Sequence, residues 1–317
     1  MKIIRTLPMA GQDEPAIALA LGNFDGVHLG HQAMLRRVVE AASDLNLVPA
    51  AMTFEPTPRE YFASTATSVW RQPRLLPLRS RLERMAEIGI ARIYLLRFDA
   101  RLAEMDAEMF VGDLLERRLN VRWFLATHDA RFGKNRMGSL DFLRARSNAF
   151  MLETMTTVEI DGKRVSSTAV RQALAAADFA RARQLLGRPY TIGGRVTHGE
   201  ARGRAIGFPT VNLPLTFKPP LSGVFAVRVH GLGTVREGVA NLGVRPTVEA
   251  AAEALPVLET HVFDFNESVY GQRIEVEFIE KLRDEMCFSD VTALTKQIED
   301  DARRAREIFL PVLRAAS

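Results

Sequence analysis

The chain has 317 residues, a length that exceeds one typical domain and fits two. Hydrophobic residues make up 47% and charged residues 25%, the mix of a globular protein, and no apolar run reaches the ~18–20 residues that span a bilayer. A single cysteine, Cys287, excludes an intramolecular disulfide and a multi-cysteine zinc site, and a net charge of +4 does not demand a nucleic-acid partner.

The first half of the sequence alternates between apolar runs and amphipathic stretches. Strands are predicted at 16–22, 47–54, 91–98, 121–127 and 150–160. Helices are predicted at 30–43, 79–89, 103–119 and 139–149. This alternation indicates βαβ units and a parallel sheet, whose carboxyl edge is the usual place for a ligand. Both LGNFDGVH (21–28) and TFEPTP (53–58) are expected at that edge.

The pattern changes after a predicted helical segment at 167–187. The strands that follow have no helices between them and are punctuated by glycine and proline, which predicts an antiparallel barrel or sandwich. An amphipathic helix closes the chain at 289–313, with Ser289 as its expected N-cap. We place the boundary at LGRP, which gives domains 1–186 and 187–317. The later strands are predicted at 190–199, 223–230, 236–243, 258–265 and 273–282.

The stretch GNFDGVHLGH (22–31) has the features of an anion-binding site. A glycine-rich turn from a strand into a helix lets the backbone approach a phosphate and directs free N–H groups at it. His28 and His31 lie on one side of the helix start and can donate hydrogen bonds to phosphate oxygens. Neither a P-loop nor a G-x-G-x-x-G fingerprint occurs in the chain. Two other interpretations stay open: a metal triad with Asp25, and ordinary surface histidines.

Two motifs resemble the nucleotidyltransferase superfamily. GNFDGVHLGH resembles its G-x-F-D-x-x-H-x-G-H signature, and RVSSTAVR (164–171) resembles its [IV]-S-S-T-x-[IV]-R signature, in the family order. The resemblance implies a Rossmann-like α/β domain that binds ATP, attack on the α-phosphate with loss of pyrophosphate, and His28 and His31 as catalytic residues. Such a reaction requires positioning and charge stabilisation. The ATP-binding residues that it implies are Gly22, Asn23, Phe24, Asp25, Gly30, Ser167, Thr168 and Arg171.

A second region, GGRVTHGEARGRAIGFPTVNLP (193–214), resembles the flap and the G-F-P-T-[AV]-N signature of riboflavin kinases. The stretches that follow keep the order of that family. From roughly residue 15 to 310, the chain therefore resembles the bifunctional riboflavin kinase/FAD synthetases of bacteria. The resemblance implies an antiparallel β-barrel kinase domain that converts riboflavin to FMN, and a first domain that adenylylates FMN to FAD. Mg²⁺, ATP and the flavins riboflavin, FMN and FAD are the implied cofactor, substrates and products.

The same resemblance assigns roles in the kinase domain. Glu259 of the L-E-x-H strand is implied as the catalytic base, which takes a proton from the ribityl hydroxyl. Thr210 and Asn212 are implied to bind the metal and the nucleotide phosphates, and oxygen ligands suit Mg²⁺. Asn241 and Arg283 are implied flavin contacts. The ATP-binding residues of this domain are Gly199, Gly203, Arg204, Gly207, Thr210 and Asn212.

One stretch departs from the family pattern. The usual G-x-D-F-R-F-G reads THDARFG (127–133), with Thr127 for the glycine and Ala130 for the aromatic. Asp129 and Arg131 remain and are the implied flavin contacts of the first domain. The departure favours one alternative, a kinase whose first domain is impaired or regulatory. A second alternative is a nucleotide- or RNA-binding module on a retired transferase fold, and the intact histidines and Glu259 argue against it.

The expected partners are small molecules, with apo-flavoproteins as recipients of the FAD. We expect no nucleic-acid partner, no membrane association and a cytoplasmic location, and the oligomeric state is left open. Basic residues in RRVVE, RSRLERM and DARRARE are interleaved with acids, which is typical of solvated helix faces. Cys287 is expected to be a small, partly buried side chain.

Overall fold

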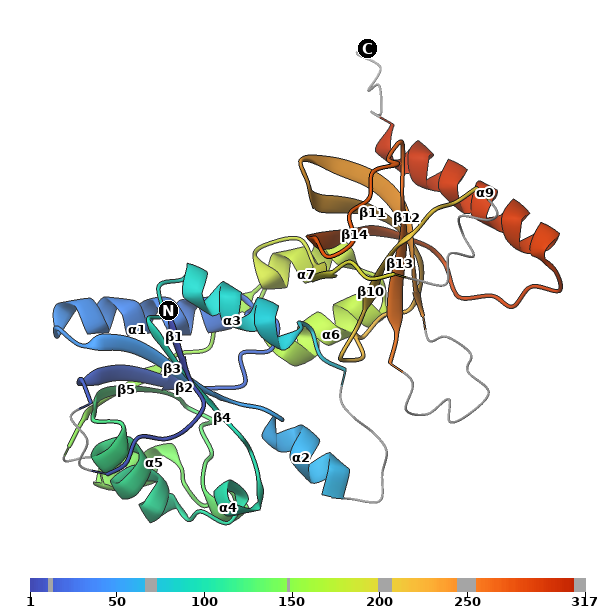
Figure 1. The fold of residues 1–317 in the computed structure, drawn as a ribbon. Coiled ribbons are helices and arrows are strands. Elements are labelled where there is room, and N and C mark those ends of the chain that lie inside the picture. Colours follow the sequence, from blue (N-terminus) through green and yellow to red (C-terminus); the bar gives the residue numbers. More distant parts are fainter. Residues whose placement is uncertain (11–13, 66–72, 147–148, 199–206, 244–254, 311–317) are drawn as a thin grey trace. The chain divides into compact units, whose positions relative to one another are not determined.

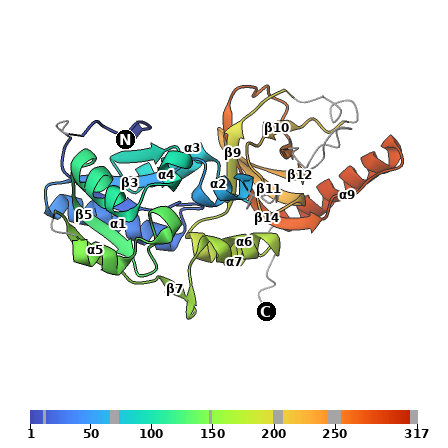
Figure 2. The same ribbon diagram turned by 90° about the horizontal axis from the view of Figure 1, so that it is seen from below.

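A computed structural model describes residues 1–10, 14–65, 73–146, 149–198, 207–243 and 255–310. The chain divides into two compact units. The first combines Met1–Gln72 with Leu78–Ser167, and the second combines Pro73–Pro77 with Thr168–Ser317. Figures 1 and 2 show both units coloured along the sequence.

The first unit is built on a six-stranded sheet whose paired strands are all parallel, which confirms the predicted α/β architecture. The strand order is β1-β4-β3-β2-β5-β6. β2 is central, so the turn that follows it opens at the middle of the carboxyl edge. The strands are β1 (Lys2–Ile4), β2 (Ile17–Leu21), β3 (Val48–Phe54), β4 (Arg92–Leu96), β5 (Val121–Thr127) and β6 (Met151–Met155).

Helices cover both faces of this sheet, with α1 and α3 on one side and α4 and α5 on the other (Figure 1). Alternate residues of β2 explain the two layers: Ile17 and Leu19 join the cluster under η1 and α5, and Ala18 and Ala20 face the opposite way. The helices and the small hairpin are α1 (Leu29–Asp44), α2 (Pro58–Thr65), α3 (Leu78–Glu87), α4 (Ala100–Ala103), η1 (Met109–Arg118), η2 (Lys134–Arg136), α5 (Leu140–Arg146), β7 (Glu159–Ile160) and β8 (Lys163–Arg164).

Two predicted elements are divided in the structure. The helix expected at 103–119 is replaced by α4 and by η1, a π-helix, because the Asp106 carboxylate accepts a hydrogen bond from the Met109 N–H at 2.7 Å and starts a new helix there. The strand expected at 150–160 ends at Met155. Asp161 and Gly162 then adopt positive φ of 54° and 67° and close the β7–β8 hairpin.

The second unit is an antiparallel barrel preceded by two helices. Its strand order is β10-β13-β12-β11-β14-β9, and a further bridge between Thr197 and Asn212 joins the two ends of the sheet. The predicted barrel is thereby confirmed. Phe225 and Phe278 pack edge to face at 5.1 Å, with Phe179 of α7 against both. The elements are α6 (Ser167–Ala175), α7 (Phe179–Leu186), β9 (Thr191–Arg195), β10 (Val211–Pro214), β11 (Gly223–Leu232), β12 (Thr234–Gly243), β13 (Val257–Val262), β14 (Arg273–Arg283) and α9 (Val291–Phe309).

The closing helix α9 packs against the outside of the barrel. Ala302, Ala305 and Ile308 contact an apolar cluster that includes Val224 and Phe263. The N-cap is Asp290, whose carboxylate accepts from the Ala293 N–H at 2.8 Å, so the expectation for Ser289 was wrong by one residue. Val291, the first residue of the helix, is 62% exposed and does not take part in this packing, whereas Leu294 and Ile298 are half-buried.

Cys287 is exposed, contrary to the expectation of partial burial, because it lies in the irregular segment between β14 and α9. Among the described residues, no helix combines the length and the apolar character needed to cross a membrane.

Candidate active sites

The turn between β2 and α1 is held in an unusual backbone conformation. Phe24, Gly26 and Val27 have positive φ of 50°, 82° and 42°. The turn is fixed at its start by the Gly22 N–H, which donates to the Met52 carbonyl at 3.1 Å. At its end the Gln32 side-chain amide donates to the Val27 carbonyl at 2.9 Å. Non-glycine residues adopt positive φ at a cost of about 1–2 kcal/mol each, so the surroundings must impose this shape.

His28 and His31 meet at the first turn of α1. His28 is the N-cap, and its Nδ1 accepts a hydrogen bond from the His31 N–H at 3.3 Å. The two rings stack with centroids 3.6 Å apart, and the ring of Phe24 packs edge-on against His31. A Cβ at Gly30 would lie 3.2 Å from the His28 ring, a tight contact that would require this ring to shift by a few tenths of an ångström. The structure thus brings both predicted histidines together at a helix N-terminus, where an anion is stabilised.

The second predicted motif of the first domain contacts this turn through Ser167. The Ser167 hydroxyl donates to the Asp25 carbonyl at 2.9 Å, and Asp25 and His28 are only 7% and 5% exposed. Thr168 and Arg171 belong to the second compact unit, in which the Arg171 Nε donates to the Pro73 carbonyl at 2.6 Å. Within the described parts of the chain, no group of three His, Cys, Asp or Glu side chains is arranged to hold a metal ion, so the triad with Asp25 has no support.

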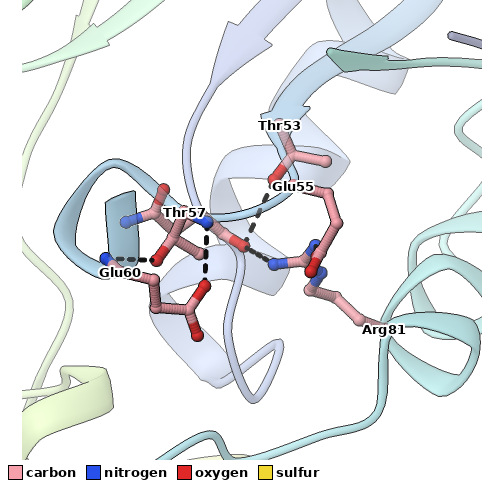
Figure 3. A network of polar contacts seen from close by, with 6 residues as sticks. Thr53, Glu55, Thr57, Glu60 and Arg81 are labelled. Atoms are coloured by element: carbon pink, nitrogen blue, oxygen red, sulfur yellow. Dashed lines mark hydrogen bonds and ion pairs between the residues drawn. The ribbon is translucent and has the colours of Figure 1, made fainter. Parts of the chain in front are cut away.

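The end of β3 forms a polar network beside this turn (Figure 3). Thr57 and Glu60 form a capping box for α2: the Glu60 carboxylate accepts from the Thr57 N–H at 2.9 Å, and the Thr57 hydroxyl accepts from the Glu60 N–H at 3.4 Å. Arg81 of α3 donates to the Asn23 carbonyl at 2.9 Å and to Glu55 at 3.2 Å. Its side chain is 3% exposed, so the expected solvated face at RSRLERM was wrong at this position.

The divergent stretch 127–133 keeps its carboxylate ionised. Burial raises the pKa of Asp129, but hydrogen bonds from Thr127 and Arg164 outweigh it and hold the pKa below its ordinary value. The Arg164 Nη2 lies 2.9 Å from the carboxylate. Ala130 packs against the apolar core. Thr127, which replaces the usual glycine, thus supplies a hydrogen bond to the predicted flavin-binding residue.

In the barrel, strand register lines up the predicted kinase residues. Asn212 of β10 pairs with Glu259 of β13, and Glu259 pairs with Asn241 of β12. Asn241 then pairs with Val224 of β11, which pairs with Arg283 of β14. Directly paired residues share one face of a sheet, and Val224 contacts the cluster under α9. This row therefore lies on the outer face of the barrel, on the side of α9.

The GFPTVN segment (207–212) is fixed next to Glu259. The Nδ1 atom of His261 lies 2.8 Å from the Pro209 carbonyl oxygen. The His261 ring also packs edge-on against Phe208, with ring centroids 5.2 Å apart. The Asn212 side chain is 6% exposed, and its amide donates to the Thr210 carbonyl at 3.4 Å. The hydroxyl of Thr210 just before β10, the amide of Asn212 in β10 and the carboxylate of Glu259 in β13 thus belong to neighbouring positions, and such oxygen donors suit a hard cation.

Other predicted kinase residues have different surroundings. Gly207 has φ of 86°, a conformation that favours glycine. Arg283 is engaged by α9, because its Nε and Nη2 donate to the buried carboxylate of Asp301 at 2.9 and 2.7 Å and its Nη1 donates to the Asp284 carbonyl. Gly199, Gly203 and Arg204 lie outside the described residues.

Removal of the Arg283 charge is expected to destabilise the second unit. The pair is buried, with side chains 16% and 3% exposed, so Arg283→Met leaves the Asp301 carboxylate uncompensated and should lower the free energy of unfolding by about 3–5 kcal/mol. Arg303 lies on α9, as Asp301 does, but its side chain is 61% exposed, so Arg303→Met should lower the free energy of unfolding by about 1 kcal/mol or less. Urea unfolding monitored for the barrel checks both values. Equal losses in the two variants would contradict this account, and addition of Asp301→Leu to Arg283→Met should restore part of the loss.

Sequence reasoning missed three residues that shape these sites. Arg164 stands in the quoted RVSSTAVR motif, so its proximity to a site could have been inferred. His261 stands in the L-E-x-H stretch, but its contact with Pro209 depends on strand pairing. Arg81 gave no signal, because an arginine in an amphipathic helix is usually solvated.

Comparisons with known proteins match both halves of the chain. The family model described as FAD synthetase matches residues 11–169, and the one described as riboflavin kinase matches residues 186–309. A bifunctional riboflavin kinase/FMN adenylyltransferase of Haemophilus influenzae is 40% identical over 313 residues, covering 98% of this chain and 99% of the relative. The enzyme of that name from Escherichia coli K12 is 41% identical over 314 residues, covering 98% of each chain.

A solved structure shares the fold across both units. It is a protein of Streptococcus pneumoniae described as a macrolide-efflux protein, and it is 28% identical to this chain. Its TM-score is 0.78, and the match covers 96% of this chain and 99% of the other. Since the sequence relatives match over nearly the full length at about 40% identity, the chain belongs to the family of bifunctional riboflavin kinase/FMN adenylyltransferases.

Proposed function

We propose that this chain makes FAD from riboflavin in two steps: ATP-dependent phosphorylation to FMN in the barrel, and adenylylation of FMN with release of pyrophosphate in the first domain. The observation that carries the proposal is the presence of both sites in one chain, with the stacked His28 and His31 at the N-terminus of α1 and Glu259 between Asn212 and Asn241 in the barrel. We place the boundary between the catalytic halves at 186/187.

In the kinase step, Glu259 accepts the proton of the terminal ribityl hydroxyl as that oxygen attacks the γ-phosphorus of ATP, and the bond from this phosphorus to the bridging oxygen breaks to release ADP. The oxygens of Thr210 and Asn212 would hold Mg²⁺, which supplies charge neutralisation on the phosphates when bound. Asn241 lies beside Glu259 in register and is proposed to orient the flavin. Arg283 occupies the same row and is proposed to act at its edge, with Asp301 fixing its orientation.

In the adenylyl-transfer step, an FMN phosphate oxygen attacks the α-phosphorus of ATP and the bond to pyrophosphate breaks. His28, His31 and the first N–H groups of α1 stabilise the charge on the phosphate oxygens. The turn from Gly22 to Asp25, together with Gly30, lets the nucleotide approach the backbone, and Ser167 supports the turn through Asp25. Thr168 and Arg171 are proposed as donors to the ATP phosphates, and Asp129 and Arg131 as flavin contacts.

The alternative of a kinase with an impaired first domain loses its main argument. The family model for FAD synthetase matches the first domain, and Thr127 contributes a hydrogen bond that lowers the pKa of Asp129. The proposed partners are therefore riboflavin, FMN and ATP, with apo-flavoproteins as recipients of FAD. We propose the cytoplasm as the compartment, supported by the single cysteine.

The proposal is tested by incubating the purified protein with ATP and Mg²⁺ and either riboflavin or FMN, and by separating the flavins chromatographically. Riboflavin should yield FMN and then FAD, and FMN alone should yield FAD. If riboflavin stops at FMN and added FMN is not converted, the first domain is impaired, and Thr127→Gly with Ala130→Phe becomes the variant to examine. If neither flavin is converted, the proposal is wrong.

A further inference from the structure

Arg81 stands out among the arginines of the first unit because its charge is buried and none of the roles described above uses it. Its side chain is 3% exposed, and its partner Glu55 is 28% exposed. Burial of a guanidinium costs free energy unless it is paired and hydrogen-bonded. The contacts of Arg81 therefore indicate its role. Nη1 donates to the Asn23 carbonyl at 2.9 Å, and Nη2 donates to the Glu55 carboxylate at 3.2 Å.

The Asn23 carbonyl accepts hydrogen bonds from two side chains. Besides Arg81 of α3, the hydroxyl of Thr53 in β3 donates to it at 3.4 Å, and Thr53 is fully buried. Asn23 immediately precedes Phe24, the first of the positive-φ residues. The peptide bond between them is planar, so fixing its carbonyl fixes the direction in which the chain enters the turn.

The turn that follows this carbonyl contains Asp25 and leads to His28, the N-cap of α1. Its backbone is strained at Phe24 and Val27, and a strained turn keeps its shape only where neighbouring groups hold it. The Gly22 N–H and Gln32 contacts hold its two ends, and Arg81 holds it between them through a charge-assisted hydrogen bond. Glu55 in turn neutralises Arg81 and orients its planar fork.

We propose that Arg81, oriented by Glu55, is a positioning residue for adenylyl transfer: it fixes the Asn23 carbonyl and thereby the placement of His28 over the reacting phosphate. This inference rests on the proposed function of the first domain. A displacement of about 1 Å of a catalytic group lowers the rate about 10²-fold. Since the misplaced group stabilises the transition state more than bound ATP, the loss should appear in kcat with little change in KM.

The test compares Arg81→Met, Arg81→Lys and Arg79→Met in the full chain. Arg79 lies on the same helix, is 67% exposed and pairs only with Glu83 among the contacts seen, so its variant is the matched control. Arg81→Met should lower kcat for FMN adenylylation about 10²-fold, with riboflavin phosphorylation unchanged. Arg81→Lys keeps one donor for the Asn23 carbonyl and should stay within about tenfold of the unmodified protein. Arg79→Met should behave like the unmodified protein.

A second measurement does not depend on turnover. Amide hydrogen exchange of a peptide covering 20–35 should be about tenfold faster in Arg81→Met than in Arg79→Met, as expected for loss of one hydrogen bond to a charged group. Unchanged kcat or unchanged exchange in Arg81→Met would overturn the proposal, as would a rise in KM for ATP alone, which indicates direct contact with the nucleotide. A parallel loss of both activities would mean general unfolding and would equally overturn it. If the unmodified protein forms no FAD, the adenylyl-transfer assignment fails, whereas faster exchange would still support the role of Arg81 in holding the turn.

Discussion

Glu259→Gln should lower the turnover of riboflavin phosphorylation by about 10²–10⁴-fold, while adenylylation of FMN by the same chain stays unchanged. Glutamine keeps the size and one hydrogen-bond acceptor of the side chain but cannot take the proton of the ribityl hydroxyl. The register that places Glu259 between Asn212 and Asn241 should persist, because backbone pairing sets it. Initial rates with saturating riboflavin, and separately with FMN, measure the two activities.

The control for this variant is Glu237→Gln. Glu237 is an exposed carboxylate on β12, the strand next to β13, and its loss should leave both rates unchanged. A Glu259→Gln protein that keeps its riboflavin affinity and its kinase turnover would remove Glu259 from the role of base. If neither the unmodified protein nor Glu259→Gln phosphorylates riboflavin and both bind it equally well, the result would favour the binding-module alternative.

The second large effect concerns His28, where capping and catalysis can be separated. His28→Ala removes the imidazole and the N-cap of α1, so it should abolish most FAD formation, by about 10²-fold or more, and cost about 1 kcal/mol of stability. His28→Asn restores a strong N-cap without a group that can stabilise the phosphate charge as imidazole does. The asparagine variant should therefore unfold like the unmodified protein and remain as inactive as the alanine variant.

FAD formation from FMN and thermal unfolding of each variant measure the two contributions. Riboflavin phosphorylation serves as an internal control, since Glu259 and Asn212 lie in the second unit. Recovery of FAD formation in His28→Asn would show that His28 acts only as a cap, and the catalytic role would then be wrong.

Local signals account for the parts of the fold that could be predicted. The run from Ile17 to Leu21 is apolar throughout because a central parallel strand is buried on both faces, and α1 follows directly after its glycine-rich turn. The Asp161-Gly162 pair is a local hairpin signal just beyond the predicted strand at 150–160, but that strand merges β7, the first strand of the hairpin, with β6. The interruption of the predicted helix before η1 has no comparable sequence signal, because an aspartate such as Asp106 in a polar stretch is also compatible with a continuous helix.

The site residues also fall into those that local sequence places together and those that only the fold brings together. His28 and His31 are three residues apart on one helix, so the sequence alone places them together. Glu259, Asn212 and Asn241 come from three strands, and only the barrel register brings them into one row. Arg81 is the extreme case, since its partners Asn23 and Glu55 lie 58 and 26 residues away and helical periodicity cannot reveal a buried charge.

The most direct test of the two-step account follows the phosphorus atoms of ATP. The protein is incubated with riboflavin or with FMN and with ATP labelled at either the α- or the γ-phosphorus. Starting from riboflavin, FMN should be labelled only by the γ-labelled ATP, whereas FAD should be labelled in both incubations. Starting from FMN, FAD should carry only the α-label, and the γ-label should appear in pyrophosphate. Appearance of the γ-label in FAD formed from FMN, or absence of the α-label from FAD, would contradict attack on the α-phosphate at the β2–α1 turn.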